Sequence, residues 1–309
     1  MIRKSFITMT GLLLATVLTI TPLRNAPHVS AKGQPVFLYV AYNNETGASY
    51  SDYFAAVRQL GEMLEERIGR KVVVEVPQGD PIRSNEQVIE ALQKGKVDIA
   101  GLQLFAYLVA HESATVEIVA NSTYNGVPTY FSQFLTHDQT GFDELSDLDS
   151  INLCWVDPLS VSGYIVPSLM LKAGGFTEAP ESRYVGSHVA VVRLIYQREC
   201  EAGAAYVDAR EPLLAELPDV YDIVQVVEVS PPIPHPYSFS VAESVSPDLR
   251  VSIATALVEI SQDEDGAMLL QILGAQNLNQ VDHSIFAGLE SLIADAGMTP
   301  QDVWDTYYH

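Results

Sequence analysis

The residues best suited to chemistry in this chain lie between Asp157 and Gly163, directly after an apolar run that predicts a strand. Ser160 and Ser162 supply hydroxyl groups, and Gly163 lets a ligand approach the backbone because it has no side chain. Pro167 fits only near the beginning of a helix, so a helix starts at these serines. Free amides and hydroxyls at a helix start form a cradle for an anion. The same residues also suit an ordinary helix N-cap, and both interpretations stay open on this run alone.

Further polar residues stand where other predicted strands end. His188 follows Gly186 and Ser187, and its imidazole can donate a hydrogen bond to an oxyanion or lie exposed at a helix start. Gln103 can donate to an oxyanion or belong to a plain loop. The other candidates are Tyr206 and Asp208 after the strand predicted at 202–207, and Tyr42 with Asn43 after the first strand. The Asp208 carboxylate can accept from a ligand or pair with Arg210.

The sequence shows no pattern typical of a metal site, a cofactor site or a nucleophile. The histidines lack the His-x-x-x-His spacing of zinc ligands. There is no P-loop, no Gly-x-Gly-x-x-Gly run and no defensible Ser-His-Asp set. We therefore expect no metal, no cofactor and no enzyme activity, and keep a two-lobed enzyme as the rival from another functional class.

Strands and helices alternate along most of the chain, which predicts mostly parallel sheets flanked by helices. Extended segments at 130–136 and 224–236 interrupt this alternation and predict two crossings between two lobes. Helices are predicted at 247–260, 265–273, 285–296 and 300–307, and we expect them to pack back on the first lobe. The strands are predicted at 36–41, 72–76, 97–102, 151–156, 183–185 and 202–207.

The first 31 residues have the pattern of an export signal. Arg3 and Lys4 precede an uncharged apolar stretch over 6–20, and Val29-Ser-Ala31 has the small-x-small form of a cleavage site. The apolar stretch is short for a membrane span, so cleavage after Ala31 is favoured over a retained anchor. We expect the mature protein in a periplasmic or other extracytoplasmic space.

Charge and cysteine content narrow the partners and the compartment. The formal net charge of −22 excludes a nucleic-acid partner, because such partners repel an acidic surface. Cys154 and Cys200 are an even pair, and an exported protein permits a disulfide between them. Because their positions relative to the two predicted strands are offset, we favour two buried unbonded cysteines.

Five segments resemble the periplasmic phosphate-, phosphite- and phosphonate-binding proteins, the substrate-binding subunits of ABC importers. Residues 155–167 match that family's V-D-P-x-S-x-S-G-Y-x-x-P signature. The other segments match its G-S-H turn and the motifs written D-A-G-A-x-x-D-x-R, V-D-I-A … A-Y-L-x-A and S-P-P-I-P. These stand at 186–188, 202–210, 97–110 and 230–234, in the family's order.

The resemblance implies a two-lobed type II periplasmic binding protein fold with two hinge crossings. It implies a first lobe at 33–129 and 236–309 and a second at 130–235. It also implies that the hydroxyls and amides around Ser160, Val161, Ser162 and Gly163, together with His188, bind the anion in a cleft between the lobes. Val161 stands where the family often has Thr, and Val189 follows the histidine where the family often has Asp.

The function that follows is an extracytoplasmic solute receptor, working as a monomer, that captures phosphate, phosphite or a phosphonate and passes it to a membrane permease. Leu102 stands where relatives that bind aminoethylphosphonate often have an aromatic residue, so an alkylamine ligand is less favoured. The alternatives are a receptor of the same fold for a sulfonate or carboxylate, or one that serves a sensor kinase.

Overall fold

The structure is a computed structural model that describes residues 33–44, 46–114, 116–149, 151–176 and 182–309. The predicted export signal lies outside the described residues. Among the helices of the described part, none combines the length and the apolar character that a membrane crossing requires.

The first sheet has six strands in the order β13-β4-β12-β3-β1-β2. Strands β1, β2 and β3 are parallel neighbours, whereas β12 runs antiparallel to β3 and β4. The strand–helix alternation predicts β1, β2 and β3 but misses the other three. The strands are β1 (Val36–Val40), β2 (Val72–Glu75), β3 (Ile99–Gln103), β4 (Val116–Thr123), β12 (Tyr237–Ala242) and β13 (Asn277–Gln280).

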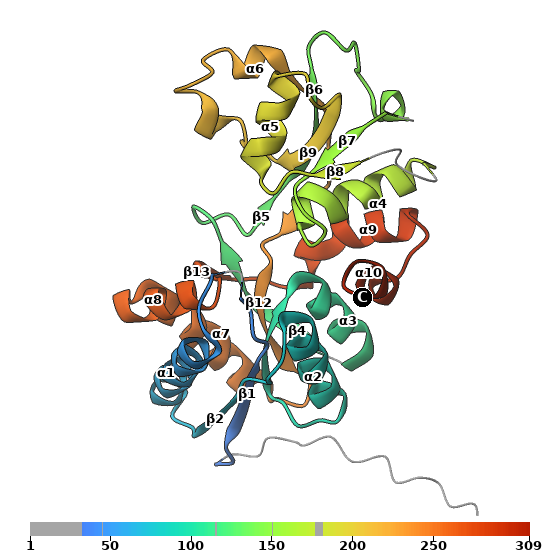
Figure 1. Cartoon of the computed structure of the whole chain (residues 1–309). Coiled ribbons are helices and arrows are strands. Elements are labelled where there is room, and N and C mark those ends of the chain that lie inside the picture. The colour runs from blue at the N-terminus through green and yellow to red at the C-terminus, as the bar shows by residue number, and fades with distance from the viewer. Residues whose placement is uncertain (1–32, 45, 115, 150, 177–181) are drawn as a thin grey trace, which may run out of the picture.

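Helices cover both faces of this sheet (Figure 1). The helices α1, α7 and α8 pack together on one face, and α2 and α3 pack together on the other. Side chains of β3 alternate between these layers: Ile99 joins the core of α1, while Ala100 and Leu102 join the core of α3. The helices are α1 (Tyr50–Ile68), α2 (Pro81–Gln93), α3 (Leu104–Ala114), α7 (Pro247–Gln262) and α8 (Glu264–Ile272).

The second sheet has five strands in the order β10-β6-β9-β7-β8. Strand β7 is parallel to β8 and β9, whereas β6 is antiparallel to β9 and β10. The strands are β6 (Ser132–His137), β7 (Leu153–Trp155), β8 (Arg183–Tyr184), β9 (Ala202–Tyr206) and β10 (Val224–Val229), and the helices beside them are α4 (Val166–Ala173), α5 (His188–Tyr196) and α6 (Val220–Ile223).

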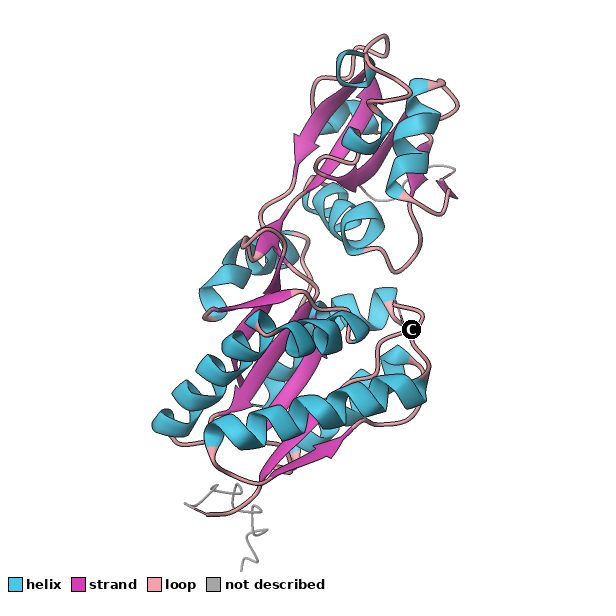
Figure 2. Cartoon of the chain, turned by 90° about the vertical axis from the view of Figure 1, so that its left-hand side faces the viewer, coloured by secondary structure: helices cyan, strands magenta, loops and turns pink. Residues whose placement is uncertain are grey.

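Two very short strands join the parts of the molecule that hold the two sheets (Figure 2). Strands β5 (Thr129–Tyr130) and β11 (Ile233–Pro234) pair antiparallel. The segments predicted as crossings are extended, but most of the first belongs to the second sheet as β6, and nearly half of the second belongs to it as β10. The link itself is therefore only a few residues long in each direction, which suits a hinge.

The last two helices touch both parts of the molecule. Helix α10 (Pro300–Tyr307) packs on α3 beside the first sheet, as we expect from the sequence. Helix α9 (Ala287–Asp295) packs on α4 beside the second sheet instead, and one apolar cluster includes Trp304, Leu289, Leu169 and Phe105. The helical tail therefore bridges the space between the two sheets.

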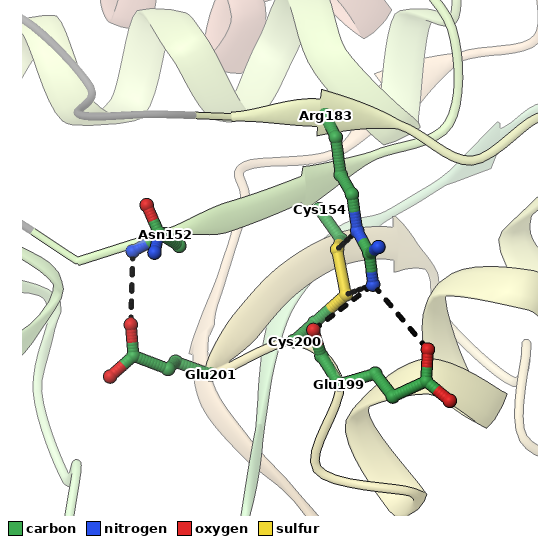
Figure 3. Close-up of a disulfide and its surroundings, with 6 residues drawn as sticks. All are labelled: Asn152, Cys154, Arg183, Glu199, Cys200 and Glu201. Carbon is green, nitrogen blue, oxygen red and sulfur yellow. Dashed lines mark hydrogen bonds and ion pairs between the residues drawn. A yellow bond between two sulfur atoms is a disulfide. The ribbon is translucent and has the colours of Figure 1, made fainter.

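Cys154 and Cys200 form a disulfide, so the expectation of two unbonded cysteines is wrong (Figure 3). Cys154 lies opposite Gly203 in the ladder of β7 and β9, while Cys200 stands just before β9. Because Cys200 precedes the strand, its backbone is not held in the ladder, and its Cα lies 6.0 Å from that of Cys154. Arg183 of β8 lies over the bridge and donates to the Glu199 carbonyl at 3.0 Å.

Candidate functional site

A cavity of about 410 Å³ lies between the two sheets, at the carboxyl ends of several parallel strands. Open α/β sheets place ligands at this edge, because the loops after the strands converge there. Its walls come from the loops after β1 and β7, the junction of β3 with α3, the starts of α2 and α5, the hinge and the end of α10. The lining residues are Asn43, Asn44, Pro81, Ile82, Gln103, Leu104, Tyr130, Asp157, Leu159, Ser160, Val161, Ser162, His188, Pro236 and Tyr308.

The loop after β7 forms a capped helix start that faces this cavity. Ser160 is the N-cap, and its Oγ accepts from the Gly163 amide at 3.1 Å. Residues 161–165 form a π-helical turn before α4 begins, a distortion frequent at functional sites. The Val161 and Ser162 amides belong to this first turn, where N–H groups lack partners inside the helix. The arrangement can therefore serve as both a helix cap and an anion cradle.

Gly163 lies behind the cradle and is absent from the lining. A side chain there would collide with Val156 and would stand 2.8 Å from Ser160 Oγ. The sequence predicted a close approach of the backbone at this position. In the structure the close approach is to Val156, directly after β7, and the Gly163 amide donates to the Ser160 cap.

Ser162 ties the cradle to the hinge. The residue lines the cavity although it is only 4 % exposed. Its carbonyl accepts from Ser132 Oγ at 2.6 Å, and the Ser132 amide donates to Ser230 Oγ at 2.9 Å. Ser230 Oγ then donates to the Pro231 carbonyl at 2.7 Å. The cradle is thus hydrogen-bonded to both segments that run toward the β5–β11 link.

His188 stands at the start of α5 and lines the same cavity. The Tyr206 amide donates to its Nδ1 at 3.2 Å, which assigns the proton of the neutral ring to Nε2. Burial lowers the pKa of His188 to about 4, and the nearby Asp157 carboxylate opposes that shift only in part. The imidazole is therefore neutral at pH 7 and can offer an Nε2–H donor to an anion.

The first-sheet side supplies amide groups. Gln103 ends β3, and its Oε1 accepts from Asn85 Nδ2 of α2 at 3.1 Å. Asn85 Oδ1 accepts in return from the Gln103 backbone amide at 3.3 Å. Asn43 and Asn44 reach the cavity from the loop after β1. Gln103, Asn43 and Asn44 therefore place neutral polar groups opposite the cradle.

Besides Gly163, three further predicted site residues do not line the cavity. Tyr42 packs against Tyr50 and Tyr53, and its hydroxyl donates to the Ala48 carbonyl. Tyr206 lies against the His188 ring, with centroids 4.7 Å apart, so it positions that histidine. Asp208 lies in a turn with φ of 72°.

Arg210, the alternative partner of Asp208, is held elsewhere. Its Nη1 donates to the Val224 carbonyl at 2.8 Å, and its guanidinium lies over the Tyr221 ring. Asp208 lies outside the cavity lining, and it acts on Arg210 through its charge, which opposes the lowering of the Arg210 pKa by burial.

Sequence reasoning missed several lining residues. Asp157 belongs to the signature run, and its Oδ1 accepts from the Leu159 amide, which shapes the turn. Tyr130 stands in the hinge, where the sequence predicted a crossing but no site residue. Tyr308 follows the last helix, and no local signal places it in the cleft. Among the described lining residues none is Lys or Arg.

Metal binding finds no support in the described part of the chain. No group of three or more His, Cys, Asp or Glu side chains there is arranged to hold a metal ion. The polar groups of the cavity are mainly hydroxyls, amides and one neutral imidazole, which as donors favour an anion.

Residues 47–286 match a family described as the phosphonate periplasmic substrate-binding proteins of ABC transporters. The chain belongs to this family. The phosphate-import protein PhnD of Mycolicibacterium smegmatis is 29 % identical over 169 residues, which are 50 % of this chain and 51 % of that relative. The match thus spans about half the length of the curated relative.

Solved structures show the same two-part architecture as this phosphonate-binding family member. XAC2383 from Xanthomonas citri, solved with a chloride ion, has a TM-score of 0.57 at 17 % identity, over 88 % of this chain and 99 % of its own. A TctC solute-binding protein from Polaromonas has a TM-score of 0.53 at 10 % identity, over 85 % of this chain and 97 % of its own. The fold is that of type II periplasmic binding proteins.

Proposed function

We propose that this chain is the extracytoplasmic receptor of an ABC importer that binds phosphate, phosphite or a phosphonate between its two sheets. The observation that carries the proposal is the cleft itself. Ser160, Val161 and Ser162 of the helix start line it together with the neutral His188. Membership of the phosphonate-binding family supports the same chemistry.

Neutral donors can bind an anion without a lysine or arginine. The helix start concentrates positive potential where its amides lack partners, and hydroxyls add further donors. Each hydrogen bond to a charged acceptor is worth about 1.5–3 kcal/mol. The acidic surface is screened beyond about 8 Å in physiological salt, so it does not outweigh donors in direct contact. Val161 contributes its amide, and Gln103 contributes from the opposite wall.

The Asp157 carboxylate on this wall favours a ligand that carries a proton. A fully ionised oxyanion would meet it with charge repulsion, whereas a P–OH group could donate to it. Hydrogen phosphate and singly ionised phosphonates both carry such a group. The proposal therefore assigns the singly protonated form as the one bound near neutral pH.

Capture would close the two parts about the β5–β11 link. A ligand that contacts both walls binds the closed form better than the open form and so shifts the population toward it. The closed, loaded form of a monomer would then dock on the permease. Export would use the predicted signal with cleavage after Ala31, and the protein would bind its ligand without turning it over.

Calorimetric titration of the mature protein with a panel of anions tests this proposal. The panel contains phosphate, phosphite and methylphosphonate, with sulfate, methanesulfonate and acetate as competitors of other classes. We expect one ligand per chain, tight binding within the phosphorus group and no product by phosphorus NMR. If the protein prefers a sulfonate or acetate, the proposed ligand class is wrong. If it converts a ligand to product, it is an enzyme and not a receptor.

A further inference from the structure

The end of helix α10 forms part of the cleft wall. Tyr308, directly after the helix, lines the cavity together with residues of α2 and α3. Helix α10 packs on α3 and also touches α9 (Figure 1). The match to the phosphonate-binding family ends at residue 286, so this wall comes from a segment that the family match does not cover.

The Tyr308 ring is held in place by aromatic neighbours. It stacks on Trp304, with centroids 4.5 Å apart and planes 12° from parallel, and it meets Phe105 at 6.2 Å. Both neighbours are buried, at 2 % and 0 % exposure. Nε2 of the next residue, His309, lies 3.1 Å from the Glu86 carboxylate of α2. The ring is therefore a fixed wall rather than a mobile tail.

The lining has an apolar section as well as a polar one. Ile82, Leu104, Val161 and Tyr308 line the cavity and also pack with a single hydrophobic cluster. The cradle serines, His188 and the amide residues make up the polar section. An inorganic oxyanion, polar on every side, gains nothing from an apolar wall and loses water beside it.

We propose that Tyr308 is a specificity-determining residue that packs on the carbon substituent of the bound anion. The site would then favour organic oxyanions with an apolar substituent over inorganic phosphate or phosphite. This inference rests on the proposed function, since it needs the anion to sit on the Ser160–Ser162 cradle. Burying a methylene group is worth about 0.8 kcal/mol, which is about a fourfold gain in affinity.

Titration of the mature protein with phosphate and with methyl-, propyl-, butyl- and phenylphosphonate tests the inference. We expect affinity to rise by about two- to fourfold per methylene in the parent protein. Tyr308→Ala should flatten this rise, so that butylphosphonate loses several-fold more affinity than inorganic phosphate does. Tyr308→Phe keeps the ring and should keep the rise, and thermal unfolding of both variants checks that they remain folded.

The outcomes separate this inference from the proposed function. If phosphate binds but longer substituents bring no gain in the parent, Tyr308 does not select the ligand, while the receptor function stands. If Tyr308→Ala weakens phosphate and butylphosphonate equally, its role is structural and the inference is overturned. If no phosphorus ligand binds at all, the proposed function fails first.

Discussion

The two walls of the cleft differ in how their polar groups are held. On the second-sheet wall, Ser160, Ser162 and His188 stand on the first turns of two helices. On the first-sheet wall, Asn43 and Gln103 come from the ends of β1 and β3, and Tyr308 comes from beyond α10. One wall is made of local helix starts, and the other is assembled from segments far apart in the sequence.

This difference separates two tasks. Helix starts aim amides and hydroxyls at one point, so in the proposed function the second-sheet wall would supply most of the attraction for an anion. The first-sheet wall offers neutral amides and apolar surface, which distinguish ligands by shape and substituent. We therefore expect substitutions on the two walls to change different quantities, the affinity for any anion on one side and the selectivity on the other.

The largest effect concerns the rigidity of the second-sheet wall. The disulfide joins residues separated by 46 positions, and loop-closure entropy predicts a loss of about 4 kcal/mol from the free energy of unfolding without it. Replacement of both Cys154 and Cys200 by alanine should show this loss in urea unfolding. The reduced parent protein is the control and should match the variant.

If the free energy of unfolding of the alanine variant lies within about 1 kcal/mol of that of the oxidised parent, the disulfide does not stabilise the protein as predicted. Because the cradle begins six residues after Cys154, loss of the disulfide should also loosen the wall. A measured increase in hydrogen exchange confined to β7 and β9 would sharpen the comparison with the first sheet.

The double variant Ser160→Ala, Ser162→Ala should weaken phosphate or phosphonate binding by about a hundredfold. Two hydrogen bonds to an anion contribute about 1.5 kcal/mol each at the low end of their range. Calorimetry measures the effect, and Ser252→Ala on α7, whose hydroxyl bonds only to the Asp248 carbonyl, is the control. Parent-like binding by a folded double variant would place the anion elsewhere.

Acid should destabilise the second-sheet wall through His188. Burial lowers the pKa of His188 to about 4, so the unfolded chain, with a pKa near 6.5, binds the proton first. This contribution to stability is present above about pH 6.5 and is lost as pH falls toward 4, with about 1–2 kcal/mol gone at pH 5. His188→Gln removes the titration and should reduce the loss between pH 7 and 5.

The same variant tests the proton assignment on the ring. A glutamine keeps an N–H donor, so it should retain part of the ligand affinity at pH 7 while losing the acid sensitivity. Denaturant unfolding at pH 7 and at pH 5 measures the loss of stability in both proteins. If the parent and His188→Gln lose the same free energy of unfolding, groups other than His188 cause the acid effect.

The smallest effect is expected on the first-sheet wall. Gln103→Ala removes one neutral amide and should weaken anion binding by about three- to tenfold, since a typical hydrogen bond contributes about 0.5–1.5 kcal/mol. Asn85→Ala should have a similar but indirect effect, because Asn85 orients the Gln103 amide. If Gln103→Ala lowers the affinity for the anion as much as the double serine variant does, the two walls do not differ in their contribution to affinity.

The sequence predicted the second-sheet wall better than the first. Ser160, Ser162 and His188 were found because capped helix starts leave a local pattern of Ser, Gly and Pro. Three strands of the first sheet were missed. In β12 (Tyr237–Ala242), serines alternate with apolar residues, as in a strand with one solvent-exposed face. Every residue of β12 is nevertheless buried, because the strand is central in its sheet. Burial on both faces comes from neighbours that the local pattern does not reveal.

The sequence by itself determined the α/β class, the strand–helix alternation, the family resemblance and the cradle, because all four depend on short-range spacing. Only the tertiary structure decided that Cys154 bonds to Cys200, that Tyr206 orients His188 and that Tyr308 reaches the cleft. Each of these depends on residues brought together from distant parts of the chain. Their approach is set by sheet order, hinge and helix packing, whose energy comes from burial that no single segment can achieve alone.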